Sequence, residues 1–191
     1  VGTLIKRDRD LIGSWSSMGE SKDCITIWQA LEKRFGTNKT SQSASLRYAE
    51  GCSLIPEGKL FDKLNSFGTG LQKTTKTDEE LTAEAVEMAQ NVDVVVVALG
   101  EPFSMTGEAA SRSDISLPGN QRKLLEELKK TGKPIVLVLM NGRPLTLEWE
   151  DENIDAILET WYGGSMAGEG IVNTLFGDTN PSGKRTMTLP L

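Results

Sequence analysis

Two carboxylates share one polar segment of the sequence. Residues 100–119 read GEPFSMTGEAASRSDISLPG, and Glu108 follows Glu101 by seven positions. The chain contains no His, which excludes nucleophilic sites of the Ser-His-Asp or Cys-His kind and His metal sites. Acid–base chemistry must then come from Glu, Asp, Lys or Tyr. This segment is therefore the first place to look for it.

The residues around the two acids differ. Glu108 is flanked by Gly107 and two alanines, small neighbours that leave room for a large substrate. A carboxyl on such a loop suits a general acid, and the same pattern also fits a solvated surface Glu. Glu101 is expected to cap or brace the loop. Arg112 and Asp114 are expected to pair with each other or with the backbone.

Three short apolar runs indicate the strands that position this segment. They are VVVVAL (94–99), IVLVLM (135–140) and AILETWY (156–162). The first two lack the polar alternation of strands with one wet face, which favours parallel strands buried on both faces. Two shorter strands are expected at 46–50 and 184–189, the second at a sheet edge. Residues 1–5 resemble the end of a strand and its turn, as if the chain were cut from a longer protein.

Helical patterns separate the apolar runs. A capping box at 77–80 opens a helix that extends to about Gln90, and Pro118 is expected in the first turn of NQRKLLEELKK, which Gly132 follows. Further helices are predicted at 23–35 and 166–176. Residues 51–76 contain several Gly and one Pro and are predicted to form a long surface loop.

This alternation of strands and helices predicts a single α/β domain over residues 1–191. We expect a three-layer α/β/α sandwich with a mostly parallel open sheet of about six strands and one antiparallel edge strand. Ligands of such sheets bind outside the carboxyl ends of the strands, here loops 100–117, 141–144 and 162–166. The last contains YGGS, which departs from the G-x-G-x-x-G spacing, so a tight turn is favoured over a phosphate site. Because the phosphate-binding loops are poor, a flavodoxin-like domain that binds a small ligand is also disfavoured.

Composition excludes several classes of partner. The 191 residues carry a net charge of −6 with Lys and Arg scattered along the chain, so no nucleic-acid partner is expected. No apolar run approaches the roughly 18 residues of a membrane span. Cys24 and Cys52 are expected to be unpaired, buried thiols. No metal site and no cofactor are expected.

Several long motifs resemble one known family. GEAASR, GKPIVLVLMNGRPL and FGDTNPSGK resemble, in order, the C-terminal α/β sandwich domain of family 3 glycoside hydrolases, and RDLIGSWS fits as well. The resemblance covers nearly the whole chain, is weakest in residues 36–76 and is greatest to the bacterial periplasmic β-glucosidases. It implies a retaining exo-acting enzyme that hydrolyses terminal β-D-glucosyl residues, in the periplasm or secreted.

The resemblance also implies roles for the loop residues. Glu108, in the EAASR segment, would be the general acid/base, and the nucleophile would be an Asp on a preceding barrel domain. Glu101, Ser111 and Arg112 would shape the loop or bind substrate. The partners implied are a β-glucoside or oligosaccharide and that barrel domain.

The chain lacks the barrel and the fibronectin-like domain of such enzymes, so we expect it to be inactive alone. We also expect it to self-associate through the exposed barrel-facing surface. The alternative is a non-catalytic carbohydrate-binding or interaction module on the same fold.

Overall fold

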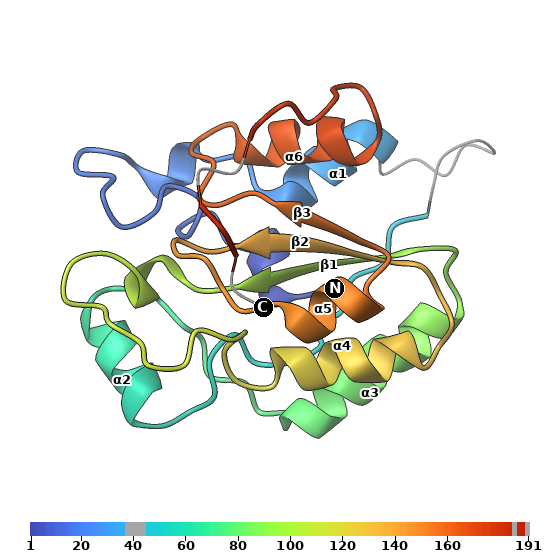
Figure 1. Ribbon diagram of the computed structural model, residues 1–191, viewed down its shortest axis with the longest axis horizontal. Helices are drawn as coiled ribbons and strands as arrows, with labels where there is room; N and C mark the ends of the chain where they lie inside the picture. Colours follow the sequence, from blue (N-terminus) through green and yellow to red (C-terminus); the bar gives the residue numbers. More distant parts are fainter. Residues whose placement is uncertain (37–44, 185–186, 190–191) are drawn as a thin grey trace.

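Helices cover both faces of a parallel sheet in the computed structural model, which describes residues 1–36, 45–184 and 187–189 (Figure 1). The sheet contains β1 (Val95–Gly100), β2 (Ile135–Met140) and β3 (Ala156–Glu159) in the order β1-β2-β3. Both pairs are parallel, and the register places Gly100 opposite Met140 at the carboxyl ends. The loops that follow the strands therefore gather at one end of the sheet.

The helices divide between the two faces (Figure 1). One face is covered by α1 (Ile27–Phe35) and α6 (Ala167–Leu175), and the other by α3 (Asp78–Gln90), α4 (Gln121–Lys129) and α5 (Glu148–Asn153). The remaining helix, α2 (Lys59–Ser66), lies off the carboxyl ends of the strands. Three short 3₁₀ helices complete the described elements: η1 (Thr3–Lys6), η2 (Ser21–Asp23) and η3 (Phe103–Met105).

The strands are buried on both faces, as the unbroken apolar runs predict. Ala98, Val138 and Met140 belong to the hydrophobic cluster that contains α1 and α6. Val97 and Leu137 belong to the cluster that contains α3 and α4. Successive strand residues point to opposite faces, so each apolar run supplies both cores.

The predicted strand count is wrong. The described residues contain three strands, all parallel, and no antiparallel edge strand. Residues 46–50 form no strand, because the one backbone hydrogen bond described for them, from Gly2 N–H to Ala49 O, does not make a ladder. Of the strand expected at 184–189, residues 185–186 lie outside the described residues, and the described remainder is not a strand.

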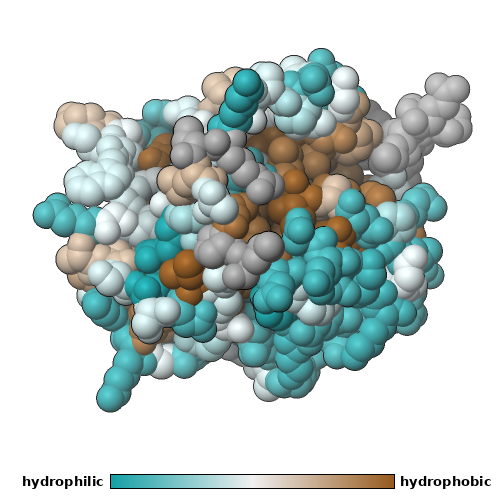
Figure 2. All heavy atoms as spheres, in the orientation of Figure 1, coloured by the Kyte–Doolittle hydropathy of each residue, from teal (hydrophilic) through white to brown (hydrophobic). Residues whose placement is uncertain are grey.

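The edge strand β3 is shorter than its apolar run. It ends at Glu159 because Trp161 adopts a φ of +50°, which turns the chain. The residues of β3 are exposed or half-buried, and Figure 2 shows apolar surface over the sheet beside hydrophilic α5. The expected tight turn after it is confirmed, since Gly164 has a φ of +80°.

Three helix predictions need correction. Residues 51–76 include α2, whose Phe61 and Leu64 are buried in the core despite the polar and Gly-rich sequence around them. The helix predicted from Asp23 begins at Ile27, because Thr26 forms a capping box with Gln29. Pro118 precedes the first turn of α4, whose N-cap is Asn120.

The remaining helix predictions are confirmed. The capping box of α3 forms as predicted, with Thr77 accepting from the Glu80 N–H. The helix predicted at 166–176 is α6, which ends one residue inside each limit, at Ala167 and Leu175. Within the described part of the chain, no helix is long and apolar enough to cross a membrane.

Candidate active site

The loop after β1 begins with a sharp turn at the carboxyl edge of the sheet. Gly100 has a φ of +137°, and a Cβ there would lie 1.8 Å from the Met140 carbonyl oxygen. A residue with a side chain cannot take this conformation against β2 without displacing its backbone. Gly100 therefore directs residues 101–117, the acid loop, across the end of β2.

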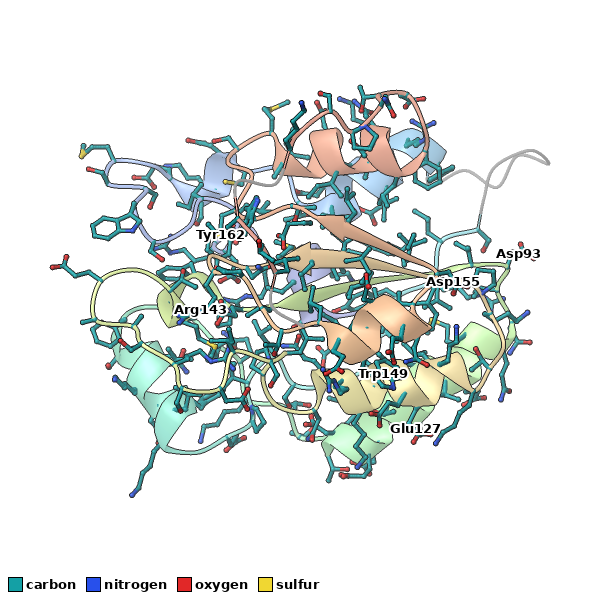
Figure 3. The ribbon with its side chains drawn as sticks, viewed as in Figure 1. Asp93, Glu127, Arg143, Trp149, Asp155 and Tyr162 are labelled. Atoms are coloured by element: carbon teal, nitrogen blue, oxygen red, sulfur yellow. The ribbon has the colours of Figure 1, made fainter. Side chains whose placement is uncertain are left out.

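Glu101 is buried at the start of the acid loop. Its side chain is fully shielded from solvent, and its carboxylate accepts from Arg112 Nη1 at 2.7 Å and lies 3.0 Å from Arg143 Nε. Tyr162 Oη donates to the Glu101 carbonyl at 3.1 Å. Arg143 and Tyr162 both lie at the carboxyl ends of the strands, whereas Asp93 and Asp155 lie at the other end (Figure 3).

The two arginines also bind the backbone of the acid loop. Arg143 Nη2 donates to the carbonyls of Met105 and, at 2.8 Å, Ala110. Arg112 Nη2 donates to the Ser116 carbonyl at 3.0 Å. Because these guanidinium groups pair with buried Glu101, they fix the loop at points on both sides of residue 108.

Glu108 lies in an exposed turn between these fixed points. Ala110 N–H donates to Gly107 O at 3.4 Å, which closes a turn over Glu108 and Ala109. Gly107 and Ala109 have φ values of +104° and +59°. The Glu108 side chain is exposed and makes no ion pair or hydrogen bond with the described residues, so its carboxylate is in contact with solvent.

A cavity of about 440 Å³ adjoins this turn. Its walls are the acid loop, the segment around Ser14 and Trp15, and the Leu60, Lys63, Leu64 and Phe67 side of α2. Among the described residues that line it, Glu108 is the one carboxylate. The cavity is therefore an open hollow with one acid at its rim.

The other sequence-predicted residues take different places. Ser111 is exposed and lines the cavity with Arg112. Arg112 pairs with Glu101, whereas Asp114 is bound to the backbone: it accepts from Ser116 N–H at 2.9 Å, which lowers its pKa. The sequence did not single out Tyr162, whose pKa is raised by burial. Tyr162 is the last residue of the apolar run 156–162, and in the structure it lies in the turn after β3.

Two further side chains contact the acid loop from the N-terminal segment. Asp10 is buried and accepts from the Phe103 N–H at 2.7 Å. The Ser14 hydroxyl lies 2.6 Å from the Phe103 carbonyl. Both belong to the RDLIGSWS segment, but their partners are about 90 positions away in the sequence, as the separations of 93 and 89 show. No local pattern reveals such a contact.

Comparison with known proteins identifies relatives over the full length of the chain. The chain is 41% identical over 190 residues to the periplasmic beta-glucosidase of Salmonella typhimurium, a match that covers 100% of this chain and 24% of that protein. It is 37% identical to a beta-xylosidase of Formosa agariphila, with 94% of this chain and 21% of that protein covered.

Solved structures also match over nearly the whole chain. The crystal structure of a beta-glucosidase from Listeria innocua in complex with glucose matches with a TM-score of 0.72 and 33% identity, over 99% of this chain and 22% of that one. The chain thus spans about a quarter or less of the length of these relatives. The model of the glycosyl hydrolase family 3 C-terminal domain matches residues 2–191. The chain therefore belongs to the family of glycosyl hydrolase family 3 C-terminal domains.

Proposed function

We propose that this chain is the acid/base-bearing domain of a retaining, exo-acting β-glucosidase that hydrolyses terminal β-D-glucosyl residues. The relatives named above are a β-glucosidase, a β-xylosidase and a β-glucosidase in complex with glucose. The name of the Salmonella typhimurium relative supports a periplasmic or secreted location for the parent protein.

The observation that carries this proposal is the position of Glu108. It is exposed at the rim of the cavity, on a turn whose two sides are fixed through Arg143 and Arg112 to buried Glu101. A general acid must reach the oxygen that it protonates and must be held in place while it does so. The exposure of Glu108 and the fixed sides of its turn support this role.

In the first step, protonated Glu108 gives its proton to the glycosidic oxygen as the bond between that oxygen and C1 breaks. A carboxylate nucleophile attacks C1 from the opposite face and forms a glycosyl-enzyme ester. In the second step, ionised Glu108 takes a proton from the water that attacks C1, and the nucleophile is released.

The nucleophile must come from another part of the enzyme. Retaining glycosidases place their two carboxyl groups about 5 Å apart. Glu108 is the one carboxylate among the described residues lining the cavity. We therefore assign the nucleophile to an Asp on a barrel domain of the parent enzyme, and we expect the 191-residue chain alone to show no turnover of an aryl β-glucoside.

The surface beside Glu108 supports contact with such a domain. Trp15, Leu60 and Phe67 line the same cavity and are 74%, 47% and 64% exposed, and Met18 nearby in the sequence is 91% exposed. Exposed apolar side chains gathered at one site indicate an interaction surface. Without its partner domain the chain is expected to self-associate there, as concentration-dependent light scattering can show.

The test is Glu108→Gln in the full-length enzyme, assayed with aryl β-glucosides of different leaving groups. Phenol leaves poorly without a proton, so its glucoside should lose about 10²–10⁴-fold in kcat/KM. The dinitrophenyl glucoside needs little protonation and should lose far less. Glu87→Gln, an exposed Glu on α3, is the matched control. Equal losses on both substrates would remove the acid/base role and favour a non-catalytic module.

A further inference from the structure

We infer that Ser14 is a positioning residue for Glu108, acting through the backbone of η3. This inference rests on the proposed acid/base role of Glu108. Ser14 is far from the acid loop in the sequence, since its hydrogen-bond partners there are 89 and 92 positions away. It touches the loop at both ends of η3, directly before the turn that carries Glu108.

One hydroxyl joins two points of the acid loop. Ser14 Oγ lies 2.6 Å from Phe103 O and 2.9 Å from Thr106 O, so it can donate to either carbonyl. It also lies 3.1 Å from Thr106 Oγ1, which supplies a second hydroxyl proton at the same place. Phe103 is the first residue of η3, and Thr106 is its C-cap. Ser14 therefore fixes the length of chain between them.

A second contact holds the same backbone from the neighbouring turn of the N-terminal segment. Asp10 Oδ1 accepts from the Phe103 N–H at 2.7 Å. The guanidinium carbon of Arg9 lies 3.9 Å from the centre of the Phe103 ring. The N–H, the carbonyl and the ring of Phe103 are thus all held by residues 9–14, which leaves this residue little freedom to shift.

The connection from Ser14 to Glu108 is short and closely packed. Gly107 alone separates Thr106 from Glu108 in the sequence. A Cβ at Gly107 would lie 3.2 Å from Ser14 Cβ, and one at Gly142 would lie 2.5 Å from Thr106 Oγ1. Ser14 packs against Thr106 on one side, and Gly142 packs against Thr106 on the other. A displacement of Thr106 is therefore expected to move the turn that carries Glu108. Misplacement of a catalytic group by about 1 Å can cost 10²-fold in rate.

The experiment compares Ser14→Ala with wild type in the full-length enzyme, across the leaving-group series. We expect kcat/KM for the phenyl glucoside to fall about tenfold, from partial misplacement of the acid. The kcat/KM for the dinitrophenyl glucoside, which reports only the steps up to formation of the glycosyl-enzyme, should change less than about twofold. Thr106→Val keeps the side-chain shape, removes the second hydroxyl and should give a smaller loss of the same kind. Ser113→Ala, an exposed serine of the same loop, is the control.

A double variant separates positioning from a general loss of structure. If Ser14 acts through Glu108, adding Ser14→Ala to Glu108→Gln should not reduce the rate on the phenyl glucoside further. An additional tenfold loss in the Glu108→Gln background would overturn the inference. So would equal losses on both substrates in Ser14→Ala and Thr106→Val.

The outcomes also distinguish this inference from the proposed function. If Glu108→Gln shows the leaving-group dependence and Ser14→Ala does not, the positioning role is wrong and the proposed function stands. If Glu108→Gln shows no dependence, the acid/base role itself is wrong, whatever Ser14→Ala does.

Discussion

The carboxylate of Glu101 and the guanidinium of Arg143 join the ends of two neighbouring strands, with Nε 3.0 Å from Oε1. Glu101 follows β1 directly, and Arg143 comes three residues after β2. The backbone pairing of β1 and β2 ends at Gly100 and Met140. Beyond that point, the ion pair between Glu101 and Arg143 holds the two chain segments together. The acid loop therefore starts from a fixed point.

Glu101→Gln should destabilise the chain. The substitution keeps the side-chain shape but removes the negative charge between two guanidinium groups in a largely buried site. Removing one partner of a buried pair costs about 3–5 kcal/mol, and the arginines' partial exposure reduces this to about 2–3 kcal/mol in the free energy of unfolding. Urea unfolding measures it. Exposed Glu87→Gln should change it by less than about 0.5 kcal/mol, and an equal effect of the two variants would contradict this account of Glu101.

Two glycines of α6 should respond in opposite directions to alanine. A Cβ at Gly168 would lie 2.3 Å from Thr26 O and 2.4 Å from Ile25 O, whereas a Cβ at Gly170 meets nothing within 4 Å. Gly168→Ala must push α6 away from the segment before α1 and should cost at least about 2 kcal/mol. Gly170→Ala should stabilise by about 0.5–1 kcal/mol. Thermal unfolding of both variants checks this, and a shared direction would show that the α1–α6 packing is different.

The two cysteines should be unreactive in the folded chain. Both are free and buried, as the sequence predicts. Burial raises the pKa of Cys24, and it raises the pKa of Cys52 to about 12. The thiolate is the reactive form, so a disulfide reagent at pH 8 should label neither residue until denaturant is added. Rapid labelling of either thiol in the native chain would contradict the burial described.

Stability should depend on the ionisation of Asp155 at low pH. The Ile135 N–H donates to its carboxylate at 2.9 Å, and this bond, followed by the charge of Lys129, lowers the pKa of Asp155. A lowered pKa contributes stability above the unfolded value of about 3.9, and that stability is lost as the pH falls through the folded value. The difference in unfolding free energy between wild type and Asp155→Asn should therefore shrink between pH 7 and pH 3. A constant difference would count against this contact.

The sequence predicts the strands and the layers well where local patterns determine them. The runs at 94–99 and 135–140 became β1 and β2 within one residue, because burial on both faces demands continuous apolar sequence. The capping box at Thr77 also holds. Residues 46–50 have a strand-like sequence but no strand partner, and α2 is stabilised by burial of Phe61 that local propensity does not reveal.

The site was predicted only in part, for a similar reason. The edge of the sheet and the acid loop follow from strand order, and both Glu101 and Glu108 lie there. Local sequence could not rank the two acids, because their difference arises from Arg143 and Arg112, which bury one carboxylate and leave the other exposed. Ser14 and Asp10 contact the loop across about 90 residues, at separations of 89 and 93. Such contacts exist only in the folded chain.

The most direct test of the acid/base role is the product that Glu108→Ala forms in azide. With the acid/base removed from the full-length enzyme, the dinitrophenyl glucoside should still form the glycosyl-enzyme, but water should attack it slowly. Azide needs no general base, so it should raise the turnover rate and yield β-glucosyl azide, identified by NMR, while the wild-type enzyme forms glucose. No rate increase and no β-glucosyl azide from a folded Glu108→Ala enzyme would contradict the assignment of Glu108.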